Sequence, residues 1–172
     1  MTGTAHERDR LLAEGAGAYR HYISAEVLHG YATAEAVGLN ATDFFCLNLL
    51  DLAGPLPAGQ LAQRTGLTTG ATTRMIDRLE QGGFVRRTRA ADRRQVIVEL
   101  SRDRQPDIDA VLEPARRRLL DVFQSFSADQ VRVIFDYFAR AAPALLAAVD
   151  ELQARPTAPP SAGATRSPDK GR

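Results

Sequence analysis

The sequence predicts a mainly α-helical protein that carries one small β-hairpin. Apolar residues recur at intervals of three and four over most of the 172 residues, which is the period of amphipathic helices. The period changes to two around residues 84–100, as expected for short strands. A composition of 44% hydrophobic and 25% charged residues is ordinary for a globular chain and sufficient to bury a core.

The first predicted helix is long. It follows a loose tail over residues 1–7 and spans residues 8–37, with these residues along one face: Leu12, Tyr19, Ile23 and Val27. At 1.5 Å per residue it measures about 45 Å, too long for one small neighbouring domain to cover. Gly15 and Gly17 weaken its first turns, and Gly38 ends it.

The next two helices have recognisable start and stop residues. Thr42 is expected to cap a helix with Asp43 in its first turn, and Gly54 ends that helix. Pro57 suits the first turn of the following helix, which ends at Gly66.

A fourth helix then leads into the hairpin. Thr68 or Thr69 is expected to cap it, and it runs to Gln81 with three apolar residues turned inward: Met75, Ile76 and Leu79. Period-two runs predict strands at 84–87 and 95–100, joined by an arginine-rich tip.

Two more helices close the chain. The first spans about residues 107–126 and contains Pro114, which should kink or interrupt it. Ser127 and Gln130 fit a capping box at the start of the second, which should kink at Pro143. Beyond residue 154 the chain lacks large apolar side chains and is expected to be disordered.

Two helices joined by a short glycine-containing turn and followed by a hairpin predict a winged helix-turn-helix over residues 39–103. Residues 8–38 and 104–154 are expected to form a helical dimerisation region, and residues 155–172 are expected to form a disordered tail. These helices carry more apolar surface than one winged domain can cover, which predicts a homodimer. A monomeric bundle is the alternative.

Positive charge is concentrated on the predicted recognition segment. Residues 64–94 contain eight arginines and three acidic residues, whereas the whole chain has a net charge of +1. Because Lys170 is the one lysine among 22 basic residues, the clustering matters more than the arginine content. A polyanion partner explains the clustering, and the helix-then-hairpin pattern indicates double-stranded DNA.

The expected DNA contacts fall into two groups. The second helix of the motif should enter the major groove through its start and its first exposed arginines: Thr68, Thr69, Gly70, Thr72, Thr73, Arg74 and Arg78. The hairpin tip should reach the adjacent minor groove or its phosphates through Arg89, Arg93 and Arg94, with Asp92 holding Arg93 or Arg94 in an ion pair. Taken singly, such features are helix caps or solvated surface; their order and spacing carry the prediction.

Other kinds of site find little support. The one cysteine, Cys46, excludes an internal disulfide and lies in an apolar helix, where an inert buried thiol is expected, although a redox role stays open. The spacing of His21 and His29 does not form a metal-ligating pair. No metal, cofactor or catalytic constellation is expected, so the protein is not predicted to be an enzyme. The chain also has no apolar run of the roughly 18 residues that a membrane span needs and no signal peptide, which predicts a cytoplasmic protein.

The segment LAQRTGLTTGATTRMIDRLEQGGFVRR, with DRRQVIVELS after it, resembles the multiple-antibiotic-resistance regulator (MarR) family of bacterial transcription factors. The shared marks are Leu61, Ala62, Leu67, Thr73, Arg74, Asp77, Arg78, Leu79, Glu80, Gly83, Arg87, Asp92, Arg93, Arg94 and Val96. The resemblance extends over residues 8–154 and implies a homodimer with two winged domains on a pseudo-palindromic operator. It also implies an acid–arginine pair in the wing, formed by Asp92 and Arg94.

The resemblance further implies a small aromatic or anionic effector, bound between the helical region and the winged domain. The expected lining is Tyr22, His29, Phe44 and Phe45, although aromatic residues at helical spacing are commonly core residues. The predicted function is a DNA-binding regulator, a repressor released by a ligand. The alternatives are a winged-helix protein without a ligand response, acting as a low-specificity DNA binder or a protein-interaction module, and an activator.

Overall fold

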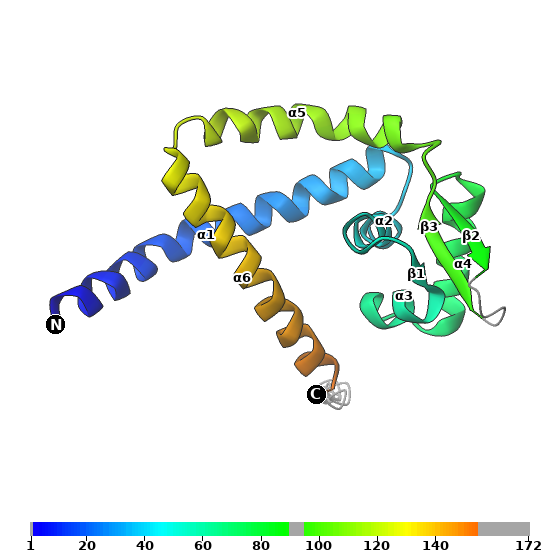
Figure 1. The fold of residues 1–172 in the computed structure, drawn as a ribbon, viewed down its shortest axis with the longest axis horizontal. Coiled ribbons are helices and arrows are strands. Elements are labelled where there is room, and N and C mark those ends of the chain that lie inside the picture. Colours follow the sequence, from blue (N-terminus) through cyan, green and yellow to red (C-terminus); the bar gives the residue numbers. More distant parts are fainter. Residues whose placement is uncertain (1, 90–94, 155–172) are drawn as a thin grey trace, which may run out of the picture. The chain divides into compact units, whose positions relative to one another are not determined.

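The computed structural model describes residues 2–89 and 95–154, with the side chains of residues 2–4 and 89 left out. The described chain contains, in order, α1 (Thr2–Ala36), α2 (Ala41–Ala53), β1 (Leu56–Pro57), α3 (Ala58–Thr65), α4 (Thr69–Gln81), β2 (Val85–Arg89), β3 (Val96–Leu100), α5 (Gln105–Phe123) and α6 (Ala128–Gln153) (Figure 1). The prediction of a mainly helical fold with a small wing is therefore confirmed. The chain divides into two compact units, with the boundary between Val122 and Phe123.

The winged domain contains the hydrophobic core of the first unit. Its buried side chains come from α2, α3, α4, all three strands and the turn between α4 and β2: Cys46, Leu47, Leu50, Leu56, Leu61, Met75, Ile76, Leu79, Phe84, Val85 and Val98. Full burial of one such large apolar side chain contributes roughly 1.5–3 kcal/mol. The predicted inward residues of α4 belong to this core, so the recognition helix is fixed by packing along one face.

A three-stranded antiparallel sheet forms the wing, in the order β1-β3-β2. Val85 pairs with Leu100 and Arg89 with Val96, as the predicted hairpin requires. Strand β1, where Leu56 pairs with Val98, was not predicted because two residues show no alternation. The prediction that Pro57 lies in the first turn of α3 was wrong: Pro57 ends β1 in an extended conformation and precedes the helix.

Two helix starts differ from the prediction. Helix α1 begins at Thr2, not after a loose tail, and continues through Gly15 and Gly17. An interior glycine costs a helix only about 1 kcal/mol, which good helix formers on both sides can offset. Helix α2 is capped by Asn40, not by Thr42: the Asn40 Oδ1 accepts a hydrogen bond from the Asp43 N–H at 2.9 Å.

Other helix ends agree with the sequence. Thr68 caps α4, and Ser127 and Gln130 form a capping box at the start of α6. Helix α5 continues through Pro114 and ends at Phe123, so of the two expected outcomes the interruption was wrong and the kink stays a prediction. A proline removes one backbone hydrogen bond, and the turns on either side can hold the helix together.

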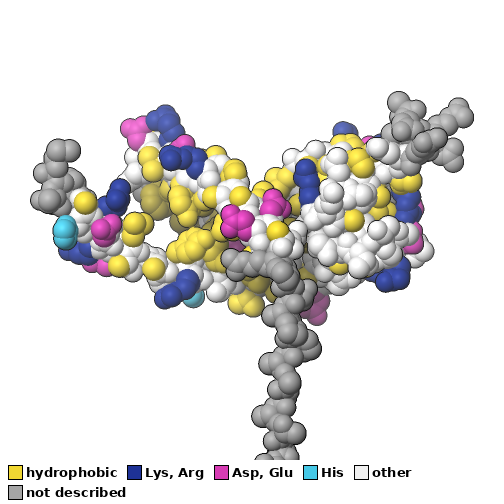
Figure 2. Space-filling model, turned by 90° about the horizontal axis from the view of Figure 1, so that it is seen from below, with side chains coloured by type: hydrophobic (Ala, Val, Ile, Leu, Met, Phe, Trp, Pro, Cys, Tyr) yellow, Lys and Arg dark blue, Asp and Glu magenta, His cyan; other side chains and the backbone are white. Residues whose placement is uncertain are grey.

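Large hydrophobic side chains are exposed along α1 and α6, and Figure 2 shows hydrophobic side chains open to the surface on one face of the molecule. In α6, for example, Phe135 and Leu146 are 55% and 64% exposed. Within the second unit, the Phe123 and Phe135 rings stack at 5.4 Å between centroids. No single helix in the described part is both long and apolar enough to cross a membrane. Helices α1 and α2 meet that criterion only as a pair, bent by 101°.

Candidate nucleic-acid interface

Helix α4 has one buried face and one exposed face. Its buried side chains are Thr72, Met75, Ile76 and Leu79, whereas Thr73, Arg74 and Arg78 are exposed. Thr72, expected to contact DNA, is 2% exposed, and its hydroxyl donates to the Thr68 carbonyl oxygen at 3.0 Å. The structure thus corrects the placement of Thr72, because the 3.6-residue period puts it on the same face as Met75 and Ile76.

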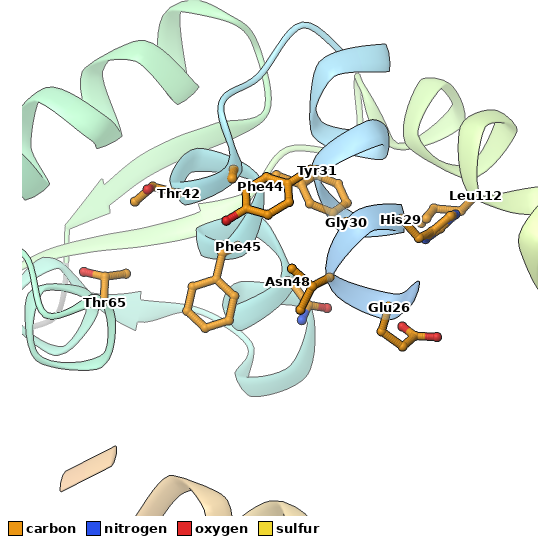
Figure 3. Close-up of a pocket in the computed structure, with 12 residues that line it drawn as sticks. Glu26, His29, Gly30, Tyr31, Thr42, Phe44, Phe45, Asn48, Thr65 and Leu112 are labelled. Carbon is orange, nitrogen blue, oxygen red and sulfur yellow. The ribbon is translucent and has the colours of Figure 1, made fainter. Parts of the chain in front are cut away.

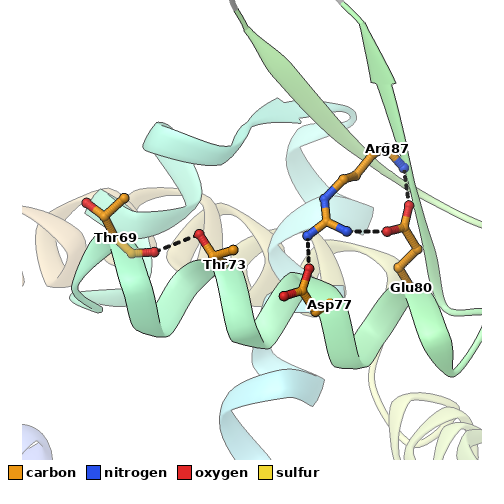
Figure 4. A network of polar contacts seen from close by, with 5 residues as sticks. All are labelled: Thr69, Thr73, Asp77, Glu80 and Arg87. Carbon is orange, nitrogen blue, oxygen red and sulfur yellow. Dashed lines mark hydrogen bonds and ion pairs between the residues drawn. The ribbon is translucent and has the colours of Figure 1, made fainter.

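The start of α4 is open and polar. The Thr68 hydroxyl accepts a hydrogen bond from the Ala71 N–H at 3.3 Å. The exposed Thr73 hydroxyl donates to the Thr69 carbonyl oxygen at 3.0 Å (Figure 4). A Cβ atom at Gly70 would lie 4.0 Å from Nη1 of Arg74. The Arg74 guanidinium therefore extends back toward the helix start, beside a residue that has no side chain.

Arg78 is held by Asp43, an acid in the first turn of α2 whose partner was not predicted. Its Nε and Nη2 donate to the two carboxylate oxygens of Asp43 at 2.9 and 2.7 Å. The Asp43 side chain is 3% exposed and the Arg78 side chain 52%. The hydrogen bond to Asp43 raises the pKa of the Arg78 guanidinium. Asp43 shares the inward face of α2 with Cys46 and Leu47, and an acid on an apolar face was the signal that a cation must pair with it.

A second ion-pair network joins α4 to the wing. The Arg87 guanidinium of β2 donates to the carboxylates of Asp77 and Glu80, and the Arg87 N–H donates to Glu80 Oε1 at 3.1 Å (Figure 4). Positions 77 and 80 share one flank of α4, and position 78 lies on the other. The recognition helix is thus held on both flanks, by α2 and by the wing.

The wing strands present further arginines. Arg86 of β2 pairs with Glu99 of β3 across the sheet at 2.8 Å. The backbone of Arg89 ends β2. The Arg89 side chain and the predicted tip residues Asp92, Arg93 and Arg94 lie outside the described residues, so the expected ion pair within the tip stays a prediction.

A pocket of about 570 Å³ lies between α1, α2 and α5 (Figure 3). His29, Phe44 and Phe45 line it, as predicted, together with residues that were not predicted: Glu26, Val27, Gly30, Tyr31, Ala41, Thr42, Asn48, Thr65 and Leu112. The predicted Tyr22 is not among the lining residues. Burial and then the nearby Glu26 carboxylate raise the pKa of the Tyr22 phenol. Tyr22 lies one helical turn before Glu26, where the lining of the pocket by α1 begins, so Tyr22 falls just outside it.

Cys46 is fully buried in the core of the winged domain. Burial, and then the charge of Asp43, raise the pKa of its thiol to about 12. Because the thiolate is the reactive form, a thiol in this setting is inert at neutral pH. The structure therefore favours the interpretation of Cys46 as a core residue.

Comparisons with known proteins agree with this geometry. Residues 39–96 match the model of the MarR family. The uncharacterized HTH-type transcriptional regulator YcgE of Bacillus subtilis (strain 168) is 31% identical over 140 residues, which cover 81% of this chain and 91% of that relative.

Solved structures share the fold. A MarR family protein from Bacillus stearothermophilus is 27% identical, with a TM-score of 0.61 over 80% of this chain and 96% of that one. The apo form of MarR from E. coli, 21% identical, has a TM-score of 0.51 over 73% of this chain and 94% of its own, a likeness of fold alone. The recognition helix, the wing and these matches together show that the chain belongs to the MarR family of winged helix-turn-helix transcriptional regulators, which are DNA-binding proteins and not enzymes.

Proposed function

We propose that the protein is a homodimeric, sequence-specific repressor that binds a pseudo-palindromic operator in the cytoplasm and is released from it by a small aromatic ligand. The observation that carries the proposal is the exposed face of α4. Its inward face is buried in the core, so the polar helix start and Arg74 point outward together. A helix fixed in this way fits the major groove, which is wide enough for one helix.

The proposed DNA contacts divide by role. The start of α4 supplies base and phosphate contacts through Thr68, Thr69, Gly70, Thr73 and Arg74, and Arg78 adds a further contact from the flank. We extend the contacts to the wing, where Arg89, Arg93 and Arg94, with Asp92, would meet the adjacent minor groove. Thr72 is left out because it is buried.

The exposed apolar side chains of α1 and α6 support the homodimer. Leu28 of α1 and Leu146 of α6 are 68% and 64% exposed, and similar residues recur along both helices. A second copy of the chain is the proposed occupant, because a dimer also presents two recognition helices. Two helices can read half-sites about 34 Å apart, one turn of DNA.

The pocket supports a small aromatic ligand. Tyr31 and Phe45 are 59% and 48% exposed and, with Phe44, give the lining aromatic surface. Glu26 is the acid of the lining, and neither lysine nor arginine belongs to the lining in the part of the chain that the structure describes. This composition favours a neutral or cationic aromatic compound over the anionic effector that the family resemblance also allowed. The proposed release follows if the ligand binds more tightly to a conformation that does not fit the operator.

The proposal is tested by measuring the affinity of the protein for the DNA upstream of its own gene at two salt concentrations. We expect nanomolar binding that weakens steeply with salt, because arginine contacts to phosphates release counterions. Arg74→Ala should weaken binding, whereas Arg117→Ala, which removes the same charge from exposed α5, should leave it unchanged.

The alternative functions predict other results. Weak binding without sequence preference would favour a low-specificity DNA binder. An absence of salt-dependent binding would favour a protein-interaction module and contradict the proposal. Repression is distinguished from activation by reporter expression in cells that carry or lack the protein.

A further inference from the structure

We propose that Asp43 is a positioning residue for DNA binding: it holds the Arg78 guanidinium so that the free edge of that group faces the DNA. The inference rests on the proposed function, in which α4 reads the operator, and it adds a residue that lies in the core and does not itself touch DNA. It is carried by the contact between the buried Asp43 and the half-exposed Arg78.

The geometry of the guanidinium supports this role. Asp43 accepts hydrogen bonds from Nε and Nη2, which form one edge of the planar group. In the part of the chain that the structure describes, no residue accepts a hydrogen bond from Nη1, so the edge that includes it can bind a second acceptor. About half of the side chain is exposed. An arginine has five N–H donors in a rigid fork, so a carboxylate on one edge fixes the direction of the other.

Asp43 is itself held in place. Its backbone N–H donates to the Asn40 side chain at 2.9 Å, in the first turn of α2, and its side chain is 3% exposed among core residues. The long Arg78 side chain is the more exposed partner of the pair. The contact with Asp43, which is fixed at the start of α2, therefore restricts the conformations of an exposed arginine on α4.

Stability alone does not account for such a pair. A buried ion pair is commonly no better for stability than well-packed apolar residues of similar volume. The pair instead favours DNA binding. An arginine that is already ordered at the exposed surface of a recognition helix loses less side-chain entropy when DNA binds. Arg78 lies one turn after Arg74 on α4, so both can reach the same DNA backbone.

The effect of Asp43→Asn on DNA affinity has opposite signs for the two explanations, a simple charge effect and the positioning of Arg78. If Asp43 acted only through its charge, removing an acid near DNA would tighten binding. If Asp43 positions Arg78, the loss of the two charge-assisted hydrogen bonds should weaken binding about tenfold, as expected for one lost arginine contact. Asp51→Asn is the matched control, because Asp51 is an exposed acid on the same helix.

The experiment measures operator affinity for the wild type, Asp43→Asn, Asp51→Asn, Arg78→Lys and the double variant Asp43→Asn/Arg78→Lys, with thermal unfolding to confirm folding. We expect Asp43→Asn and Arg78→Lys each to weaken binding about tenfold, since lysine keeps the charge but not the fork. Asp51→Asn should bind as the wild type does. The double variant should bind no more weakly than either single variant, because both remove one contact.

Wild-type or tighter binding by Asp43→Asn would overturn the inference, and so would additive effects in the double variant. If Asp43→Asn does not fold, Arg78→Lys decides: wild-type affinity overturns the inference, and weakened binding supports it. The proposed function fails separately, through absent operator binding by the wild type or an unaffected Arg74→Ala.

Discussion

Glu80 of the recognition helix accepts hydrogen bonds from both the backbone N–H and the guanidinium of Arg87 on β2. The same guanidinium also reaches Asp77, one turn earlier on α4. Because one arginine joins two acids of the helix to strand β2 of the wing, the helix and the wing are linked by ion pairs in addition to the hydrophobic core. Their relative placement determines whether both can contact the same stretch of DNA.

Removal of the Arg87 guanidinium should loosen this junction. We expect Arg87→Met to lower the free energy of unfolding by about 2 kcal/mol, because it deletes charge-assisted hydrogen bonds to two partners. Arg86→Met on the same strand is the control. Among the described residues the Arg86 side chain pairs with Glu99 alone, and it is largely exposed, so its loss should cost less than about 1 kcal/mol. Urea unfolding measures both, and equal losses would contradict the role given to Arg87.

The observed cap of α2 gives a second prediction. Asn40→Ala should destabilise the protein by about 1 kcal/mol, since it removes the side-chain acceptor for the Asp43 N–H. Thr42→Ala should change stability by less than about 0.5 kcal/mol. Thermal unfolding of the two variants distinguishes them. A larger loss for Thr42→Ala would restore the cap that the sequence had predicted.

Cys46 gives a pH-dependent prediction. Its pKa rises from an ordinary value of 9.0 to about 12 in the folded protein, because burial and then Asp43 disfavour the thiolate. The protonated thiol therefore contributes stability below pH 9, and that contribution is lost as the pH rises toward 12. We expect the folded protein to resist thiol-modifying reagents at pH 8 and the urea-unfolded protein to react rapidly. Rapid modification of the folded protein would contradict the burial of Cys46.

The proposed homodimer predicts a concentration-dependent stability. When folding and association are linked, dilution lowers the unfolding temperature by mass action. We therefore expect the transition temperature to fall steadily when the protein is diluted a hundredfold, and sedimentation to give about twice the chain mass of 18.7 kDa. A transition temperature that does not change with dilution, together with a monomer mass, would contradict the dimer.

Much of the fold was predictable because its signals are local. The Thr68 cap, the apolar stripe of α4 and the period-two strands each depend on residues close in sequence, and all three appear in the structure. Strand β1 was not predictable, because its two residues become a strand only through pairing with β3. The continuity of α5 through Pro114 likewise depends on the turns on both sides of the proline.

The site was predictable in part. Thr73 and Arg74, which were expected to contact DNA from their place near the helix start, are exposed, and His29, Phe44 and Phe45 do line the pocket. The partners of Arg78 and Arg87 were not predicted, because an ion pair between elements depends on tertiary packing. Asp43 and Arg78 are 35 residues apart in sequence. The burial of Thr72 could have been predicted, since it continues the stripe of Met75 and Ile76.

A footprint of the protein on the DNA upstream of its own gene, compared with that of Arg74→Ala, tests the central claim most directly. The account predicts two protected half-sites about one helical turn apart for the wild type, and their loss in Arg74→Ala at the same concentration. Diffuse protection, or a footprint that Arg74→Ala leaves unchanged, would contradict the assignment of α4 as the element that reads DNA.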